Sequence, residues 1–135
     1  ARRYFSAEEA DSFQALDVSE YNERFFDLWT LKESYIKACG MGMAIPLKDF
    51  TFHFQPQGLE ISFAEGREDC PEHWYFWQYR YREQFQLALA LKDGSGNEAG
   101  GAGKKVKIYE GVPMQEFTEC GLEIRNRSAT LKETA

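Results

Sequence analysis

Large apolar residues recur at helical spacing over residues 20–39. One stripe repeats every three to four positions, as the core-facing side of a helix requires. Its members are Phe25, Leu28, Leu31, Tyr35, Ala38 and Cys39. The opposite side also carries Phe26, Trp29 and Ile36. We therefore expect one long helix from about residue 20 to residue 39 that is buried on both sides.

Capping signals indicate where the helices begin and end. Ser6 with Glu9 forms a capping-box pattern, so we predict a short first helix that runs to about Leu16. Ser19 is the expected N-cap of the long helix. Gly40 suits its C-terminal end, because glycine readily adopts the left-handed conformation that commonly ends a helix.

Period-two alternation follows the two helices and indicates strands. We predict strands at residues 47–54, 59–63, 74–82 and 85–91, with a turn at residues 55–58 that makes the first two a hairpin. The resulting fold class is α+β, with two helices followed by an antiparallel β-meander within residues 1–92.

The chain changes character after residue 92. Residues 93–103 are glycine-rich without apolar periodicity, which is typical of a flexible linker or loop. Residues 104–135 are expected to form a short edge strand near 105–109 and then a polar tail, to which we assign no function.

Composition narrows the class of protein. The chain has 135 residues, of which 43% are hydrophobic and 16% aromatic, enough for one small core. A net charge of −6 argues against nucleic acid or an anionic membrane surface as partner. The sequence contains no apolar run of membrane-spanning length and no signal peptide, so we expect a cytoplasmic protein. Three cysteines without C-x-x-C spacing argue against a zinc site or a disulfide framework.

Glu33 and Lys37 are the candidate chemical groups on the long helix. In one interpretation they form an exposed i,i+4 ion pair worth about 0.2–0.5 kcal/mol. In the other, their apolar neighbours bury the carboxylate, which then needs a cation. The second interpretation makes Glu33 a Mg²⁺ ligand, with Lys37 and Lys32 as contacts for a pyrophosphate.

Three ordered segments resemble one family. They are W-T-L-K-E-S-Y-I-K at residues 29–37, G-M-G-M at 40–43 and P-L-K-D-F at 46–50, preceded by R-R-Y-F-S-A-E-E at 2–9. Together they are similar to the second signature of Sfp-type 4′-phosphopantetheinyl transferases and its lead-in, and the resemblance covers about residues 1–91.

The resemblance implies transfer of the phosphopantetheine arm of coenzyme A to a serine of an acyl or peptidyl carrier protein. Such carriers serve fatty acid, polyketide or nonribosomal peptide biosynthesis. By position, Glu33 would bind Mg²⁺ and activate the carrier serine, and Lys37 would touch the coenzyme A phosphates, with Lys32 in a supporting contact. Carrier docking would fall to the segment after the helix, for which we name Gly40, Met41, Met43 and Phe50.

One family feature is missing from the sequence. Sfp-type enzymes are pseudo-dimers of two similar halves, and the first half bears a G-[IV]-D-x-E motif that supplies further metal ligands. This chain has no such motif. We therefore expect a C-terminal half that is inactive alone and that pairs with a missing N-terminal half or a second copy. The alternatives are a non-catalytic module that binds carrier protein, or a homo-oligomeric holo-acyl-carrier-protein synthase.

Overall fold

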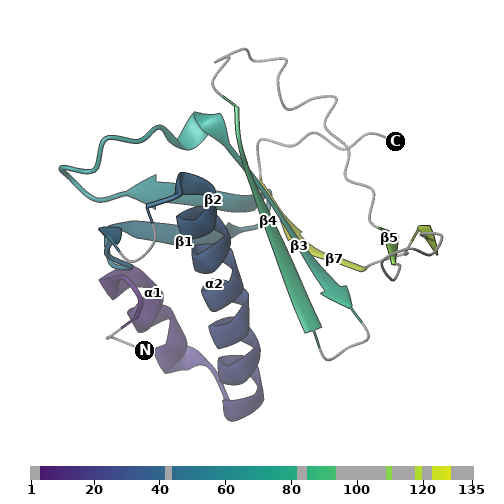
Figure 1. The fold of residues 1–135 in the computed structure, drawn as a ribbon. Helices are drawn as coiled ribbons and strands as arrows, with labels where there is room; N and C mark the ends of the chain where they lie inside the picture. The colour runs from purple at the N-terminus through teal and green to yellow at the C-terminus, as the bar shows by residue number, and fades with distance from the viewer. Residues whose placement is uncertain are drawn as a thin grey trace.

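The computed structural model describes residues 4–41, 44–81, 85–93, 109–110, 118–119 and 123–128. The two α-helices come first and the strands follow (Figure 1). The helical elements are α1 (Ala7–Ser12), η1 (Phe13–Ala15), α2 (Val18–Cys39) and the short turn η3 (Pro71–His73). The strands are β1 (Phe50–Gln55), β2 (Gly58–Phe63), β3 (Trp74–Tyr81), β4 (Phe85–Lys92), β5 (Tyr109–Glu110), β6 (Thr118–Glu119) and β7 (Glu123–Arg127).

The predicted capping box at the start of α1 is confirmed. The Ser6 hydroxyl accepts from the Glu9 amide at 3.2 Å, and the Glu9 carboxylate accepts from the Ser6 amide at 2.9 Å. These bonds satisfy two backbone donors that the first turn of a helix leaves unpaired. The helix tightens to 3₁₀ geometry after Ser12 and ends at Ala15, close to the expected end.

The start of α2 differs from the prediction. Asp17, not Ser19, is the N-cap, because its carboxylate accepts from the Glu20 amide at 2.9 Å and Glu20 returns a bond to the Asp17 amide. Ser19 instead donates its hydroxyl to Asp17. The predicted end at Gly40 is confirmed, with a left-handed φ of 69°.

The antiparallel strands of the α+β prediction form two hairpins. β1 pairs with β2, and β3 pairs with β4 along its whole length. The other edge of β3 carries β7, so the three strands lie in the order β4, β3, β7. A parallel bridge between Leu59 and Ser128 connects β2 to the end of β7. The sequence pattern did not predict β7, which brings part of the supposed polar tail into the sheet.

The core lies where α2 crosses the two hairpins (Figure 1). Its buried members are apolar and largely aromatic: Phe5, Phe13, Leu28, Leu31, Tyr35, Ile45, Phe50, Phe52, Leu59, Ile61, Trp74 and Phe76. Leu28, Leu31 and Tyr35 belong to the predicted apolar stripe, whereas Phe26 on the other side is 56% exposed. The expectation that α2 is buried on both sides is therefore wrong.

No helix in the described ranges is both long enough and apolar enough to cross a membrane.

Candidate functional site

Glu33 and Lys37 project from the same side of α2, one turn apart. The Lys37 ammonium lies 3.4 Å from the Glu33 carboxylate, and the two side chains are 77% and 45% exposed, respectively. The expectation of a buried Glu33 is thus wrong, and the contact between the two is an exposed i,i+4 ion pair of small energy. Exposure leaves both groups accessible to a ligand, which a buried pair would not be.

Lys32 lies beside Glu33 in sequence but faces the interior. Its side chain is 1% exposed, and its ammonium contacts the Glu9 carboxylate at 2.6 Å. It also donates to the backbone carbonyls of Leu47 and Phe50. A lysine ammonium has three donors, and these three acceptors use all of them. The structure therefore corrects the expected phosphate contact of Lys32, because no donor remains to make it.

The structure places the residues named for carrier docking in different environments. Met41 is 59% exposed and Gly40 is also exposed, so both lie at the surface next to the end of α2. Phe50 is fully buried in the core and packs against Tyr35, which corrects its expected contact with a partner. Met43 lies outside the described residues.

A partly buried hydrogen-bond network anchors the C-terminal half of α2. The Tyr35 hydroxyl donates to the Asp69 carboxylate at 2.6 Å and accepts from the Arg67 guanidinium at 2.7 Å. The indole of Trp74 and the amide of Cys70 donate to the other Asp69 oxygen at 3.0 and 2.8 Å. This network fixes the helix that carries Glu33 against the loop between β2 and β3.

The same network shifts two pKa values in opposite directions. Burial, together with the bond to Asp69, raises the pKa of Tyr35 well above its usual range. For Asp69, burial favours the neutral acid, but the bonds from Tyr35, Trp74 and the Cys70 amide outweigh it and lower the pKa. The carboxylate is thereby kept ionised and the phenol neutral, the two states that this hydrogen bond requires.

A second charged cluster lies toward the other end of α2. The Arg125 guanidinium contacts both Asp27, at 3.1 Å, and Glu23, at 2.8 Å, and Arg80 also bonds to Glu23. The Asp27 side chain is only 7% exposed. The sequence analysis missed this cluster, because Arg125 is 98 residues from Asp27 and no local pattern connects them.

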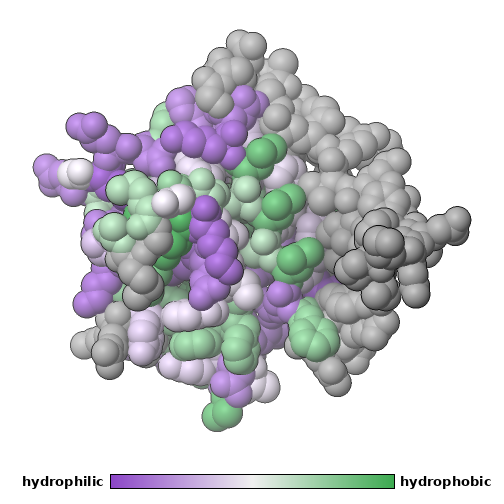
Figure 2. All heavy atoms as spheres, in the orientation of Figure 1, coloured by the Kyte–Doolittle hydropathy of each residue, from purple (hydrophilic) through white to green (hydrophobic). Residues whose placement is uncertain are grey.

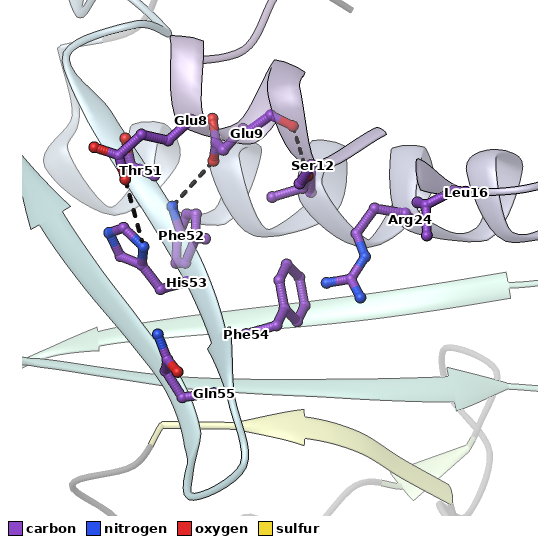
Figure 3. Close-up of a pocket in the computed structure, with 11 residues that line it drawn as sticks. Glu8, Glu9, Ser12, Leu16, Arg24, Thr51, Phe52, His53, Phe54 and Gln55 are labelled. Atoms are coloured by element: carbon purple, nitrogen blue, oxygen red, sulfur yellow. Dashed lines mark hydrogen bonds and ion pairs between the residues drawn. The ribbon is translucent and has the colours of Figure 1, made fainter. Parts of the chain in front are cut away.

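A cavity of about 330 Å³ lies between α1, α2 and β1 (Figure 3). Its lining includes Arg24, whose guanidinium stacks 3.9 Å from the centre of the Phe54 ring, and His53, whose ring bonds to Ser62. The lining contains neither Glu33 nor Lys37. The cavity is therefore separate from the predicted catalytic groups.

Glu33 fits as one ligand of a Mg²⁺ ion, because a half-exposed carboxylate supplies the hard oxygen that this ion prefers. Within the described ranges, however, no three His, Cys, Asp or Glu side chains are grouped closely enough to hold a metal. A magnesium site at Glu33 would need further oxygen ligands from elsewhere.

Comparison with known proteins identifies related sequences. The family model of the 4′-phosphopantetheinyl transferase superfamily matches residues 1–90. A 4′-phosphopantetheinyl transferase of Bacillus subtilis is 32% identical over 90 residues, which are 66% of this chain and 38% of that protein. The 4′-phosphopantetheinyl transferase Sfp of Bacillus subtilis (strain 168) is 34% identical over 90 residues, with the same 66% and 38% coverage.

A human relative extends the similarity along the chain. The human L-aminoadipate-semialdehyde dehydrogenase-phosphopantetheinyl transferase is 29% identical over 124 residues, which are 85% of this chain and 36% of that protein. Coverage of 85% requires that the match include residues beyond 92. No solved structure gives a significant match. The chain spans about 38% of the length of the two bacterial relatives.

Proposed function

The chain belongs to the 4′-phosphopantetheinyl transferase superfamily, and from that premise we propose that it forms one half of a transferase acting on a carrier protein. The arm of coenzyme A would pass to a serine hydroxyl of an acyl or peptidyl carrier protein. In that step the serine oxygen forms a bond to the phosphorus next to the pantetheine, the pyrophosphate bridge breaks, and adenosine 3′,5′-bisphosphate leaves.

One observation carries the proposal: Glu33 and Lys37 are exposed together on one side of α2. We assign Glu33 as a Mg²⁺ ligand and as the group that accepts the serine proton, and Lys37 as a contact for the coenzyme A phosphates. When bound, Mg²⁺ would neutralise negative charge on the pyrophosphate. The Lys37 ammonium would stabilise the same charge as the leaving group separates.

The exposed surface of β4 is evidence for a second, complementary half. Its outward residues form a row of exposed apolar side chains, Phe85, Leu87, Leu89 and Leu91, at 58%, 45%, 41% and 41% exposure. Figure 2 shows hydrophobic side chains along this strand. A contiguous apolar surface of this kind is typical of an interaction site. We propose that the complementary half covers it, and that Met41 faces the carrier protein.

Replacing Glu33 tests the proposed chemistry. Glu33→Gln keeps the shape of the side chain but removes its charge, so carrier modification should fall at least about a hundredfold while the fold is kept. Mass spectrometry of the carrier protein would measure gain of the arm, in a protein that joins this chain to a half bearing G-[IV]-D-x-E.

The matched control is Glu8→Gln, since the Glu8 carboxylate is also exposed, at 74%, and lies on the other helix. Glu8→Gln should leave the rate unchanged. A near-normal rate for Glu33→Gln would reject the assignment. A fall in melting temperature of several degrees together with the loss of rate would indicate a structural ion pair instead.

A further inference from the structure

A buried ion pair lies directly behind the exposed pair on α2. Lys32 adjoins Glu33 in sequence, yet the side chains of Lys32 and its partner Glu9 are each only 1% exposed. Ionised groups are costly to bury unless they are fully paired. The bonds that Lys32 and Glu9 make around them should therefore explain why a charged pair is buried next to Glu33.

The Lys32 ammonium connects α2 to the segment that follows it. It donates to the carbonyl of Leu47, before β1, and to the carbonyl of Phe50, the first residue of β1, at 2.8 Å. The same ammonium lies 4.4 Å from the centre of the Phe50 ring. Lys32 therefore fixes the position of the chain just before β1 relative to the helix.

Glu9 completes the connection from the side of α1. One carboxylate oxygen accepts from the Ser6 amide at 2.9 Å and contacts Lys32, and the other accepts from the Phe52 amide at 3.0 Å. Figure 3 shows the Glu9 carboxylate pointing at the backbone of β1. Two side chains thus join α1, α2 and β1 at one point.

We propose that Lys32 and Glu9 are positioning residues that hold the segment of residues 44–50 against α2, and so set the placement of the carrier-facing surface, which includes Met41, relative to Glu33. The inference rests on the proposed function only where it calls that surface carrier-facing. Burial lowers the pKa of Lys32, and the Glu9 carboxylate opposes this effect and favours the charged form.

The hydrogen bonds require each charge at its own position. Lys32 donates hydrogen bonds to two carbonyl oxygens, and Glu9 accepts hydrogen bonds from two amides. Exchanging the two residues would place donor against donor and acceptor against acceptor. The double variant Glu9→Lys with Lys32→Glu should therefore fail to hold residues 44–50 against α2, even though its net charge is unchanged. That result would separate positioning by hydrogen bonds from attraction between charges.

Amide hydrogen exchange on the chain tests the proposal. Lys32→Met keeps the length of the side chain but removes all three donors. Exchange should rise about tenfold or more at the amides of Asp49 and Phe52, because the bonds that order this segment are lost. The amides of the β3–β4 ladder should exchange as in the unmodified protein. Glu9→Gln should give the same local pattern, although Glu9 lies on α1.

The matched control is Lys37→Met, which removes an exposed lysine from the same helix. It should leave exchange unchanged but weaken binding of coenzyme A, measured in the protein completed by a half bearing G-[IV]-D-x-E. Lys32→Met and Glu9→Gln should keep coenzyme A affinity within about twofold and raise the KM for carrier protein.

Two results would overturn the inference. Unchanged exchange at residues 49–52 with a loss of coenzyme A binding in Lys32→Met would make Lys32 a phosphate ligand. Increased exchange throughout the chain in both Lys32→Met and Glu9→Gln would make the pair a general stabiliser of the domain. If Lys37→Met leaves coenzyme A binding unchanged while the local exchange pattern appears, the assignment of Lys37 fails and the positioning role remains.

Discussion

At the scale of single residues, hydrogen bonding decides which side chains of α2 remain available for chemistry. Lys32 and Lys37 have the same ammonium group, but the first has three protein acceptors and the second has one exposed carboxylate neighbour. Tyr35 is fully buried and bonded to Asp69 and Arg67. The site therefore consists of an exposed pair supported by buried neighbours with complete hydrogen bonding.

The pH dependence of stability should report the state of Asp69. Its folded pKa is lowered from 3.8, so the stability it contributes is present in full above that value and is lost as pH falls through the folded pKa. Asp69→Asn should cost about 1–3 kcal/mol at pH 7, because a charged acceptor of several bonds is removed. The difference between the two proteins should shrink below about pH 3.8.

Denaturant unfolding at pH 7 and at a series of acid values would measure this difference. A cost that stays constant down to pH 2 would contradict the role of the Asp69 charge.

At the scale of elements, the charges of α2 hold a strand from the far end of the chain. Arg125 of β7 reaches Asp27 and Glu23 on α2. On β3, the fully buried Gln78 donates to the carbonyl of Asp27 at 3.0 Å and accepts from Asn126 at 2.7 Å. Bonds from Arg125 and Arg80 lower the pKa of Glu23. β7 is thus attached to both the helix and the sheet.

Removing Arg125 should destabilise the domain. Arg125→Met leaves the Asp27 carboxylate buried without its partner, which costs about 3–5 kcal/mol. The double variant Asp27→Leu with Arg125→Met should recover most of this loss, because no charge is then left buried. Thermal or urea unfolding would measure both.

Arg80→Met is the comparison, since it removes an arginine from a more exposed pair and should cost less than about 1 kcal/mol. Equal losses in Arg125→Met and Arg80→Met, or no recovery in the double variant, would show that the buried charge at Asp27 is not the cause.

At the scale of the whole molecule, α2 offers one carboxylate, Glu33, beside Lys37 in the segment at residues 29–37, and β4 carries a row of exposed apolar side chains. Magnesium held by one or two carboxylates depends on substrate phosphates and water for its remaining ligands. Metal binding by this chain alone should therefore be weak, and the complementary half that we propose should improve both the metal site and the burial of β4.

We predict that the isolated chain is catalytically silent. Mass spectrometry should detect no transfer of the arm to a carrier protein by this chain alone. Activity should appear when a half bearing G-[IV]-D-x-E is supplied in the same polypeptide or as a separate one. Transfer by the isolated chain at a rate comparable to that of the completed protein would mean that unrecognised residues, or a second copy, supply the missing ligands.

Local patterns in the sequence determined the helices and both hairpins, because helix bonds join residues a few positions apart and each hairpin pairs two strands that are consecutive in the chain. The capping box at Ser6, the end of α2 at Gly40 and the β1–β2 turn all follow from such bonds. The ordered motif around Glu33 and Lys37 likewise indicated the family that the comparison confirms. The roles assigned to Glu33 and Lys37 remain predictions.

Only the tertiary structure decided what each residue of the motif faces. Lys32 turns inward because Glu9, 23 positions earlier, and two carbonyls beyond Gly40 come together around its ammonium. β7 joins β3 because Arg125 pairs with Asp27 on α2 and Asn126 bonds to Gln78 on β3, both far away in the chain. Periodicity places Lys32 four residues after Leu28, on the apolar side of α2. The acceptors around its ammonium come together only when the chain folds, so the sequence pattern could not show which groups would pair with it.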